Sequence, residues 1–507
     1  MLAWTIYSAW IGAAVALMLP RRCSQWARAV ALLAASCVLG IVLVALAQHP
    51  SGAMQTVALR PWIPMLGIQY SLAADGISLT LLLLTGLAAV AGVFFSWNVE
   101  RRAPEFFALY LLLIGAVCGV FLSRDLFLLF VFYEIAIVPK YFLIAIWGST
   151  RREYGAMKLV LYSFAGSAMV LLGLLAAYVA SGAHSMTLDD LARYPYPAHM
   201  QMWAFPLVFV GFAVLAGLWP LHTWAPTGHV AAPTAASMLL AGVVMKLGAY
   251  GCLRVAMTLF PLGLAEWRGV FALLGVVGIV YGAVAALVQR DFKFVIGYSS
   301  ISHMGFVLLG LMTLNMIGLS GAVLQMFSHG ILAGLLFAVA GRMVYDRTHT
   351  RELSALQTLR LDKAIPFAAV TFAIAGAASM GLPGFSGFVA ELMVLVGAWR
   401  AYPMLAIGAG VGIAVGVAYI WRAMQQAFFA GGTGTEQDHC IPAQAQPHAQ
   451  PHAQEPLPAI TLPERFGAWL LIAASIVVGV YPQFLLRLID GALRGPLFAG
   501  LSMGGLR

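Results

Sequence analysis

Charged residues are scarce in this sequence. Only 9% of its 507 residues are Asp, Glu, Lys or Arg, whereas 62% are hydrophobic. A soluble domain carries about 25% charged residues. Apolar runs of about 18 residues or more, the length that an α-helix needs to cross a bilayer, recur along the chain, and the short alternating segments of a membrane β-barrel are missing. The composition excludes a soluble globular protein and predicts an all-α polytopic membrane protein.

Cysteine is also scarce, and its five copies show no paired spacing. Cys37, Cys118 and Cys252 lie in apolar runs, where a thiol behaves as a small apolar side chain. Neither a disulfide framework nor a zinc or iron–sulfur site is indicated. No glycine-rich nucleotide-binding motif follows a predicted strand. The sequence therefore predicts a chain with no cofactor or redox centre of its own.

Fourteen apolar segments are long enough to be candidate membrane spans. They lie near residues 2–19, 28–47, 78–96, 106–122, 125–147, 158–181, 203–224, 231–257, 269–288, 293–314, 317–343, 365–399, 403–429 and 466–486. The twelfth is too long for one straight helix. The first lacks a basic segment and a small-residue cleavage site, which predicts a retained helix rather than a signal peptide.

The formal charge of +9 reports topology rather than a nucleic-acid partner. Of the 28 Lys and Arg residues, 17 lie in loops after odd-numbered spans and 9 on the opposite side, while Lys140 and Lys246 lie inside spans. The positive-inside rule then places the odd loops in the cytoplasm and both termini in the periplasm.

The longest polar stretch, 431–463, is rich in Pro, Gln and His and is predicted to be a disordered cytoplasmic loop. Its histidines and cysteine could bind a metal, but prolines interrupt any regular helix that would align them. These residues are His439, Cys440, His448 and His452. We therefore favour a solvated linker over a metal site.

Two spans contain similar breaks. Gly217-Leu218-Trp219-Pro220 interrupts the seventh span and Gly381-Leu382-Pro383-Gly384 the twelfth. Proline removes a helical hydrogen bond, and matched breaks in two halves of a chain are typical of inverted-repeat transporters. Because the breaks are five spans apart, two five-helix units would have opposite orientations. Gly and Pro are also common in ordinary membrane helices, which is the alternative explanation.

Several ionisable residues lie deep within the predicted spans, and those singled out are Glu134, Lys140, Lys246, His303, His329 and Glu391. A charge at the centre of a membrane helix costs roughly 2.5–3.5 kcal/mol, so these groups are expected to face one another, water or a partner. A hydrated row of such groups can carry protons, because each charge changes the protonation of its neighbour. A dry static network of structural pairs would use the same residues, and the sequence leaves both possibilities open.

At these residues the sequence resembles the antiporter-like membrane subunits of complex I, in particular the subunit M (mitochondrial subunit 4) family. The resemblance runs from about residue 80 to 430. Its motifs include Ser123-Arg124-Asp125-Leu126, Pro220-Leu221-His222-Thr223-Trp224, Ser302-His303-Met304-Gly305 and Gly381-Leu382-Pro383-Gly384.

The resemblance implies a fold of about fourteen transmembrane helices with two inverted five-helix repeats and discontinuous helices 7 and 12. The implied parts are a three-helix segment 1–100, bundles 106–257 and 269–429, the loop 431–463 and a C-terminal segment 464–507. It also implies a bacterial inner-membrane location, other membrane-arm subunits of complex I as partners, and protons as the transported ion. Redox chemistry in distant subunits would drive the transfer.

Residue by residue, the resemblance makes Glu134 the fifth-helix glutamate, Lys246 the central lysine, His303 and His329 the connecting histidines and Glu391 the twelfth-helix acid. All are then expected to transfer protons.

Three positions depart from the family pattern. Leu215 stands where a seventh-helix lysine is usual, Lys140 where an apolar residue is usual, and Thr227 where aspartate is frequent. We hypothesise that Lys140 replaces the missing amine as the partner of Glu134. The alternatives are a membrane subunit of an Mrp-type antiporter or membrane-bound hydrogenase, and a structural spacer that does not pump.

Overall fold

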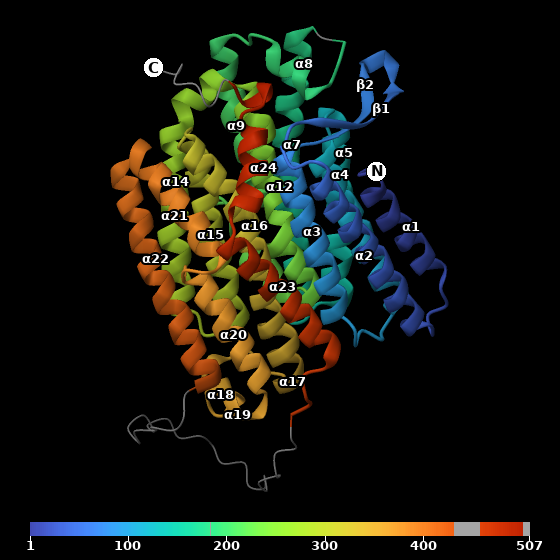
Figure 1. Ribbon diagram of the computed structural model, residues 1–507, viewed down its shortest axis with the longest axis vertical. Coiled ribbons are helices and arrows are strands. Elements are labelled where there is room, and N and C mark those ends of the chain that lie inside the picture. The colour runs from blue at the N-terminus through green and yellow to red at the C-terminus, as the bar shows by residue number, and fades with distance from the viewer. Residues whose placement is uncertain (183, 430–456, 500–507) are drawn as a thin grey trace, which may run out of the picture.

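The computed structural model describes residues 1–182, 184–429 and 457–499 and shows a bundle of long helices (Figure 1). In these residues, 12 helical segments are long and apolar enough to cross a membrane, and two shorter apolar helices, α1 (Trp4–Met18) and α20 (Pro366–Ser379), lie among them. The prediction of an all-α polytopic membrane protein is confirmed. The predicted loop between the last two spans falls largely on residues 430–456, which lie outside the described residues together with its candidate metal ligands.

The N-terminal part and first bundle contain α2 (Ser24–Gln48), α3 (Gly76–Phe95), α4 (Ala103–Leu122), α5 (Leu126–Ile135), α6 (Ile137–Trp147), α7 (Arg152–Ser181), α8 (Leu188–Arg193), α9 (Ala198–Ala216), α10 (Trp224–Ala231), α11 (Thr234–Leu239), η2 (Leu240–Val244), α12 (Met245–Gly251), η3 (Cys252–Ala256) and α13 (Met257–Leu259). Segments α11 to α13 form one continuous span, Thr234–Leu259, in which η2 and η3 are π-helical.

The second bundle and C-terminal part contain α14 (Pro261–Val288), α15 (Phe292–Met312), α16 (Met316–Ala338), η4 (Val339–Tyr345), α17 (Asp346–Thr348), α18 (Leu353–Gln357), α19 (Leu361–Ala364), α20, α21 (Ser386–Ala401), α22 (Pro403–Met424), η5 (Gln425–Phe429), α23 (Leu462–Val480), α24 (Gln483–Leu493) and η6 (Pro496–Phe498). The apolar cores of the span Thr234–Leu259 and of α16 are fully buried in the bundle, whereas most residues of α22 are partly or fully exposed. Two of the predicted site residues, Lys246 and His329, lie on the two buried segments.

A local motif recurs at opposite ends of the bundle. Asp125 caps α5 by accepting the second and third backbone amides of that helix, and Asp291 does the same for α15. Each capping residue also forms an antiparallel bridge with the chain after the next long helix, at Thr187 and Glu352. The short helices that follow, α8 and α18, lie at the top and bottom of Figure 1. Two equivalent motifs of opposite orientation are what an inverted repeat requires.

The two predicted breaks also have matching geometry. Helix α9 ends at Ala216 before Gly217, which has φ 86°, and α20 ends at Ser379 shortly before Gly381, which has φ 76°. In both, the amide after the glycine donates to a carbonyl five residues earlier, at 2.9 and 3.1 Å. This pattern ends a helix with a left-handed residue, and glycine adopts that conformation without a steric penalty. The chain resumes as α10 and α21, so both breaks lie inside the bundle.

The unpredicted elements include a β-hairpin and a separate helix near the end of the described chain. Strands β1 (Gln55–Ile63) and β2 (Ile68–Ala74) form an antiparallel hairpin, with the short 3₁₀ segment η1 (Pro64–Leu66) at its turn. The last predicted span, 466–486, ends as a helix at Val480, and the separate amphipathic helix α24 follows. Both elements belong to the same end of the molecule as α8 (Figure 1).

Candidate functional site

Lys246 and His329 meet at the centre of the bundle. Lys246 is fully buried on α12 and His329 is 3% exposed on α16. The Lys246 Nζ lies 2.8 Å from Nδ1 of His329 and also donates to the carbonyl of Ala241 in the preceding π-helical segment. Such π segments are frequent at functional sites. One proton shared between an amine and an imidazole at hydrogen-bond distance can reside on either group.

Two glycines allow this contact. A Cβ atom at Gly242 would meet the carbonyl oxygen of Gly330 at 3.0 Å, and one at Gly330 would meet the carbonyl oxygen of Gly242 at 2.6 Å and Cδ1 of Leu84 at 2.5 Å. The backbones of η2 and α16 therefore approach as closely as they do only because both positions lack a side chain. The crossing places Lys246 opposite His329.

We expect Gly330→Val to lower the melting temperature of the assembled protein, because overpacking a close contact typically costs about 1–3 kcal/mol. Gly410→Val on α22 is the matched control, since a Cβ there meets nothing within 4 Å. Thermal unfolding of the purified protein measures both. Equal melting temperatures for the two variants would contradict the close crossing.

His303 and Glu391 form a second buried pair. His303 on α15 is 8% exposed and Glu391 on α21 is 5% exposed. The imidazole Nδ1 lies 2.9 Å from Oε1 of Glu391, and its Nε2 lies 3.1 Å from Oγ of Ser379 at the end of α20. Gln325 on α16 donates to the same Glu391 oxygen at 3.3 Å. The break between α20 and α21 thus delivers a hydroxyl and a carboxylate to one histidine.

The two pairs are adjacent. The rings of His303 and His329 stack with their centroids 5.4 Å apart. Both rings, Ser379 and Glu391 line a cavity of about 10 Å³, which is roughly the space that one water molecule requires. Lys246, His329, His303 and Glu391 therefore form a nearly continuous row of titratable groups across four helices.

Glu134 and Lys140 lie apart from this row. Glu134 is at the end of α5, before the interruption at Ala136, and Lys140 is on α6. Lys140 is 1% exposed, and within the described chain its amine and Oε1 of Glu134 have no hydrogen-bond partner. They interact electrostatically but form no ion pair within 4 Å. Lys140 thus faces the protein interior and not lipid, as the compensation hypothesis requires.

Leu215 occupies an apolar contact in the first bundle. Leu215 lies on α9 and is 2% exposed. Its backbone packs closely against Gly248, two residues after Lys246: a Cβ atom on Gly248 would lie 3.0 Å from the carbonyl carbon of Leu215. Among the hydrogen bonds and ion pairs of the described residues, none joins Glu134 or Lys140 to Lys246. The polar connection is therefore continuous in the second bundle and interrupted in the first.

A further buried lysine, Lys293, lies between the row and the end of the bundle that carries α18 and α19. Lys293, in the first turn of α15, is 2% exposed and donates to the carbonyl of Ala232 at 3.3 Å. It lines a cavity of about 190 Å³ that Asp346 and Thr234 also line. His229 is fully buried and interacts electrostatically with both Lys293 and Lys246. The two ring nitrogens of His229 have no hydrogen-bond partner among the described residues, so its interaction with the two lysines is electrostatic only.

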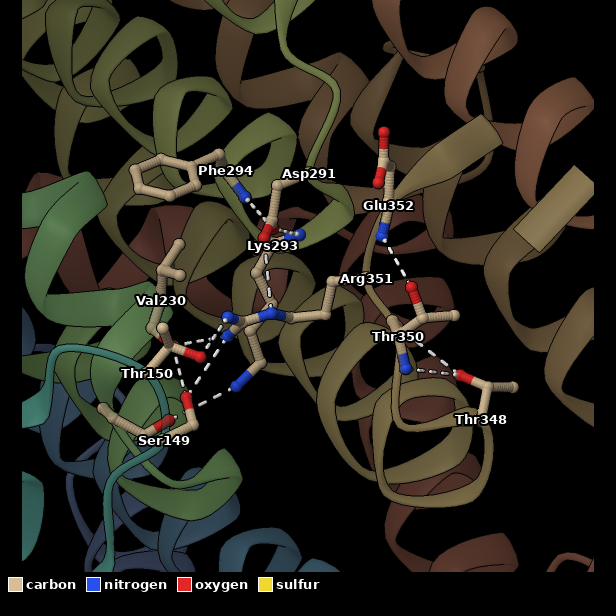
Figure 2. Close-up of polar contacts among 11 residues, drawn as sticks. Ser149, Thr150, Val230, Asp291, Lys293, Phe294, Thr348, Thr350, Arg351 and Glu352 are labelled. Carbon is tan, nitrogen blue, oxygen red and sulfur yellow. Dashed lines mark hydrogen bonds and ion pairs between the residues drawn. The ribbon is translucent and has the colours of Figure 1, made fainter. Parts of the chain in front are cut away.

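Arg351 fixes the loops beside this lysine. Its guanidinium donates to the carbonyl of Val230 at 3.0 Å and to the hydroxyls of Ser149 and Thr150 at 3.2 and 3.3 Å. Its Nε pairs with Asp291 at 3.3 Å. Figure 2 shows the side chain reaching from its own loop across to these residues of the first bundle. The contacts hold the two bundles together next to Lys293.

Sequence reasoning missed several polar members of this site. Gln325 and Ser379 are neutral, so a search for charged residues inside spans passes over them, although Gln325 stands four residues before His329 and therefore on the same helix face. His229 and Lys293 were not singled out, because His229 lies between two predicted spans and Lys293 is the first residue of another.

Broken helices around a buried row of titratable groups are the architecture typical of membrane transporters that move protons or other ions. The chain belongs to the NADH:quinone oxidoreductase/Mrp antiporter transmembrane family, whose model matches residues 123–416. Among curated relatives, it is 39% identical over 416 residues to NAD(P)H-quinone oxidoreductase chain 4 1 of Synechococcus sp. (strain JA-2-3B'a(2-13)), covering 80% of this chain and 78% of that protein. It is 36% identical over 453 residues to chain 4 2 of Microcystis aeruginosa, covering 86% and 81%.

Solved structures show the same fold. The chain is similar to one in respiratory complex I from Thermus thermophilus, with a TM-score of 0.87 and 29% identity over 99% of both chains. A chain of the Mrp complex from Dietzia sp. DQ12-45-1b has a TM-score of 0.83 and 21% identity, covering 100% of this chain and 98% of that one. The second likeness is one of fold alone.

Proposed function

We propose that this chain is a proton-translocating membrane-arm subunit of a bacterial respiratory NADH:quinone oxidoreductase, or complex I. The observation that carries the proposal is the buried row Lys246–His329–His303–Glu391, whose members are 2.8 and 2.9 Å apart within each pair. The curated relatives and the Thermus thermophilus structure support the assignment to this complex. The chain would hold no redox centre and would receive its driving energy from other subunits.

Protons would enter from the end of the bundle that carries α18 and α19, which the distribution of basic residues assigns to the cytoplasm. From the cavity beside Lys293 they would pass by way of His229 to Lys246. Lys293 and His229 support this route because both are buried, and because His229 interacts electrostatically with both Lys293 and Lys246.

The next steps would follow the row. A proton on Lys246 would move to His329, cross the small cavity through one water to His303, and reach Glu391. The Oε2 atom of Glu391 lies 3.3 Å from the position that a Cβ atom on Gly381 would occupy. The carboxyl group therefore faces the break between α20 and α21. Each transfer changes the charge next to the following group, and that change drives the following transfer.

The complex can be identified by purifying the full-length chain with an affinity tag from the membranes of its own organism. The proposal predicts that flavin- and iron–sulfur-containing subunits copurify and that the preparation reduces quinone with NADH. Copurification of small cation-antiporter subunits without NADH oxidation would contradict it and favour the Mrp-type alternative.

The interruption around Leu215 favours a second possibility for the first bundle, namely a spacer that conducts no protons. If Lys140 instead replaces the usual amine, Lys140→Met should lower NADH-driven proton uptake in inverted vesicles severalfold, because Glu134 loses the cation beside it. Lys158→Met, at a partly exposed lysine of α7, is the control. Undiminished uptake in the Lys140 variant would exclude compensation and support a silent first bundle.

A further inference from the structure

A second cluster of buried charge lies at the other end of the bundle, near α24. Arg254, in the π-helical segment η3, is 4% exposed, and Asp75, the N-cap of α3, is 1% exposed. The two form an ion pair of 2.6 Å. The guanidinium also donates to the hydroxyls of Tyr250 and Ser78, at 3.1 and 3.3 Å. None of these residues belongs to the row that leads from Lys246 to Glu391.

These contacts leave one nitrogen of the Arg254 guanidinium without a hydrogen-bond acceptor. The Nη1 of Arg254 is buried and has no acceptor among the described residues, and the same holds for Nη1 of Arg124, whose other nitrogens pair with Asp189. A buried donor without an acceptor costs about 1–3 kcal/mol, and more if the donor is charged. Two such donors in one place indicate that an acceptor belongs between them.

Both arginines line the same cavity of about 280 Å³, together with Asp75 and with Arg494, which follows α24. Three cations and one carboxylate make this lining net positive. A single water needs only about 10–15 Å³ on this measure, so a polyatomic anion fits with its hydration water. The remaining wall is apolar or glycine and consists of Ala53, Met54, Gly491, Ala492, Gly495, Pro496, Leu497 and Phe498.

We propose that this cavity binds a phosphate-type oxyanion through Nη1 of Arg124, Nη1 of Arg254 and the side chain of Arg494. Planar guanidinium groups match tetrahedral oxyanions in geometry and charge. The anion joins the starts of α3 and α5 to η3 and to the segment after α24, and so fixes the C-terminal segment to the first bundle. Its source is the headgroup of a phospholipid or inorganic phosphate.

The intact complex, purified as for the copurification experiment, tests the site. Native mass spectrometry measures retained phospholipid, and equilibrium dialysis of the delipidated complex measures binding of inorganic phosphate. Arg494→Gln and Arg124→Gln are suitable variants, because Arg494 is exposed and Arg124 lies partly at the surface. Arg487→Gln is the matched control, an exposed arginine of α24 that does not line the cavity.

We expect the two variants, and not the control, to lose one retained phospholipid, or to bind inorganic phosphate about tenfold or more weakly, the change expected for one charge-assisted hydrogen bond. The first result identifies a lipid headgroup and the second a free anion, and either supports the site. Equal lipid retention and equal phosphate binding in wild type and all variants would overturn it. Neither result depends on proton pumping or on the identity of the copurifying subunits.

Discussion

Lys246→Met is expected to reduce NADH-driven proton uptake by at least about tenfold, because a positioned proton-transferring group typically contributes about two orders of magnitude or more. Lys246 is the member of the row that His329 contacts and with which His229 interacts electrostatically, so every route described above passes through it. Methionine fills a similar volume without a titratable group. Proton uptake by inverted membrane vesicles, recorded together with NADH oxidation, measures the effect.

Assembly is the necessary control for this variant. A fully buried amine opposes folding, and Lys246 forms no ion pair among the described residues, so methionine leaves no buried counter-charge behind. We therefore expect Lys246→Met to assemble at wild-type levels. A variant that assembles and pumps normally would show that protons bypass the central lysine.

Arg254→Gln is expected to destabilise the protein by about 3–5 kcal/mol, because it leaves the Asp75 carboxylate buried without a cation. Asp75 is 1% exposed and its ion pair with Arg254 measures 2.6 Å. The loss should appear as a marked fall in melting temperature or in the amount of protein recovered from the membrane. It should exceed the effect of Arg494→Gln at the rim of the same cavity.

The double variant Asp75→Asn/Arg254→Gln separates charge burial from lost packing. Asparagine caps a helix as well as aspartate does, so α3 keeps its N-cap while the buried charge disappears. We expect the double variant to recover most of the stability that Arg254→Gln loses. A double variant that is less stable than the single one would mean that the carboxylate is not held by Arg254.

Much of the fold could be predicted from the sequence because hydrocarbon imposes simple rules. Apolar length predicted the spans, and the glycines and prolines of two segments predicted the breaks that the structure places at Gly217 and Gly381. The β1–β2 hairpin and α24 escaped prediction because hydropathy detects long apolar runs, whereas strands of 9 and 7 residues and an amphipathic helix of 11 are short and partly polar.

The charged members of the central row were predictable as residues, but their arrangement was not. Charge inside a span singled out Lys246 and Glu391, yet the sequence could not show that His329 contacts the first and His303 the second, because these contacts join different helices. The same limitation applies to Lys140. Its burial comes from the packing of α6 against α4 and α7, which lie elsewhere in the sequence.

Protons are proposed to leave through the pair formed by His303 and Glu391. The most direct test is the ratio of protons taken up to NADH oxidised in inverted vesicles carrying Glu391→Gln, with Glu266→Gln as the control because Glu266 is exposed on α14. The account predicts a ratio clearly below that of wild type and of the control, with the complex assembled. An unchanged ratio in assembled Glu391→Gln would contradict it.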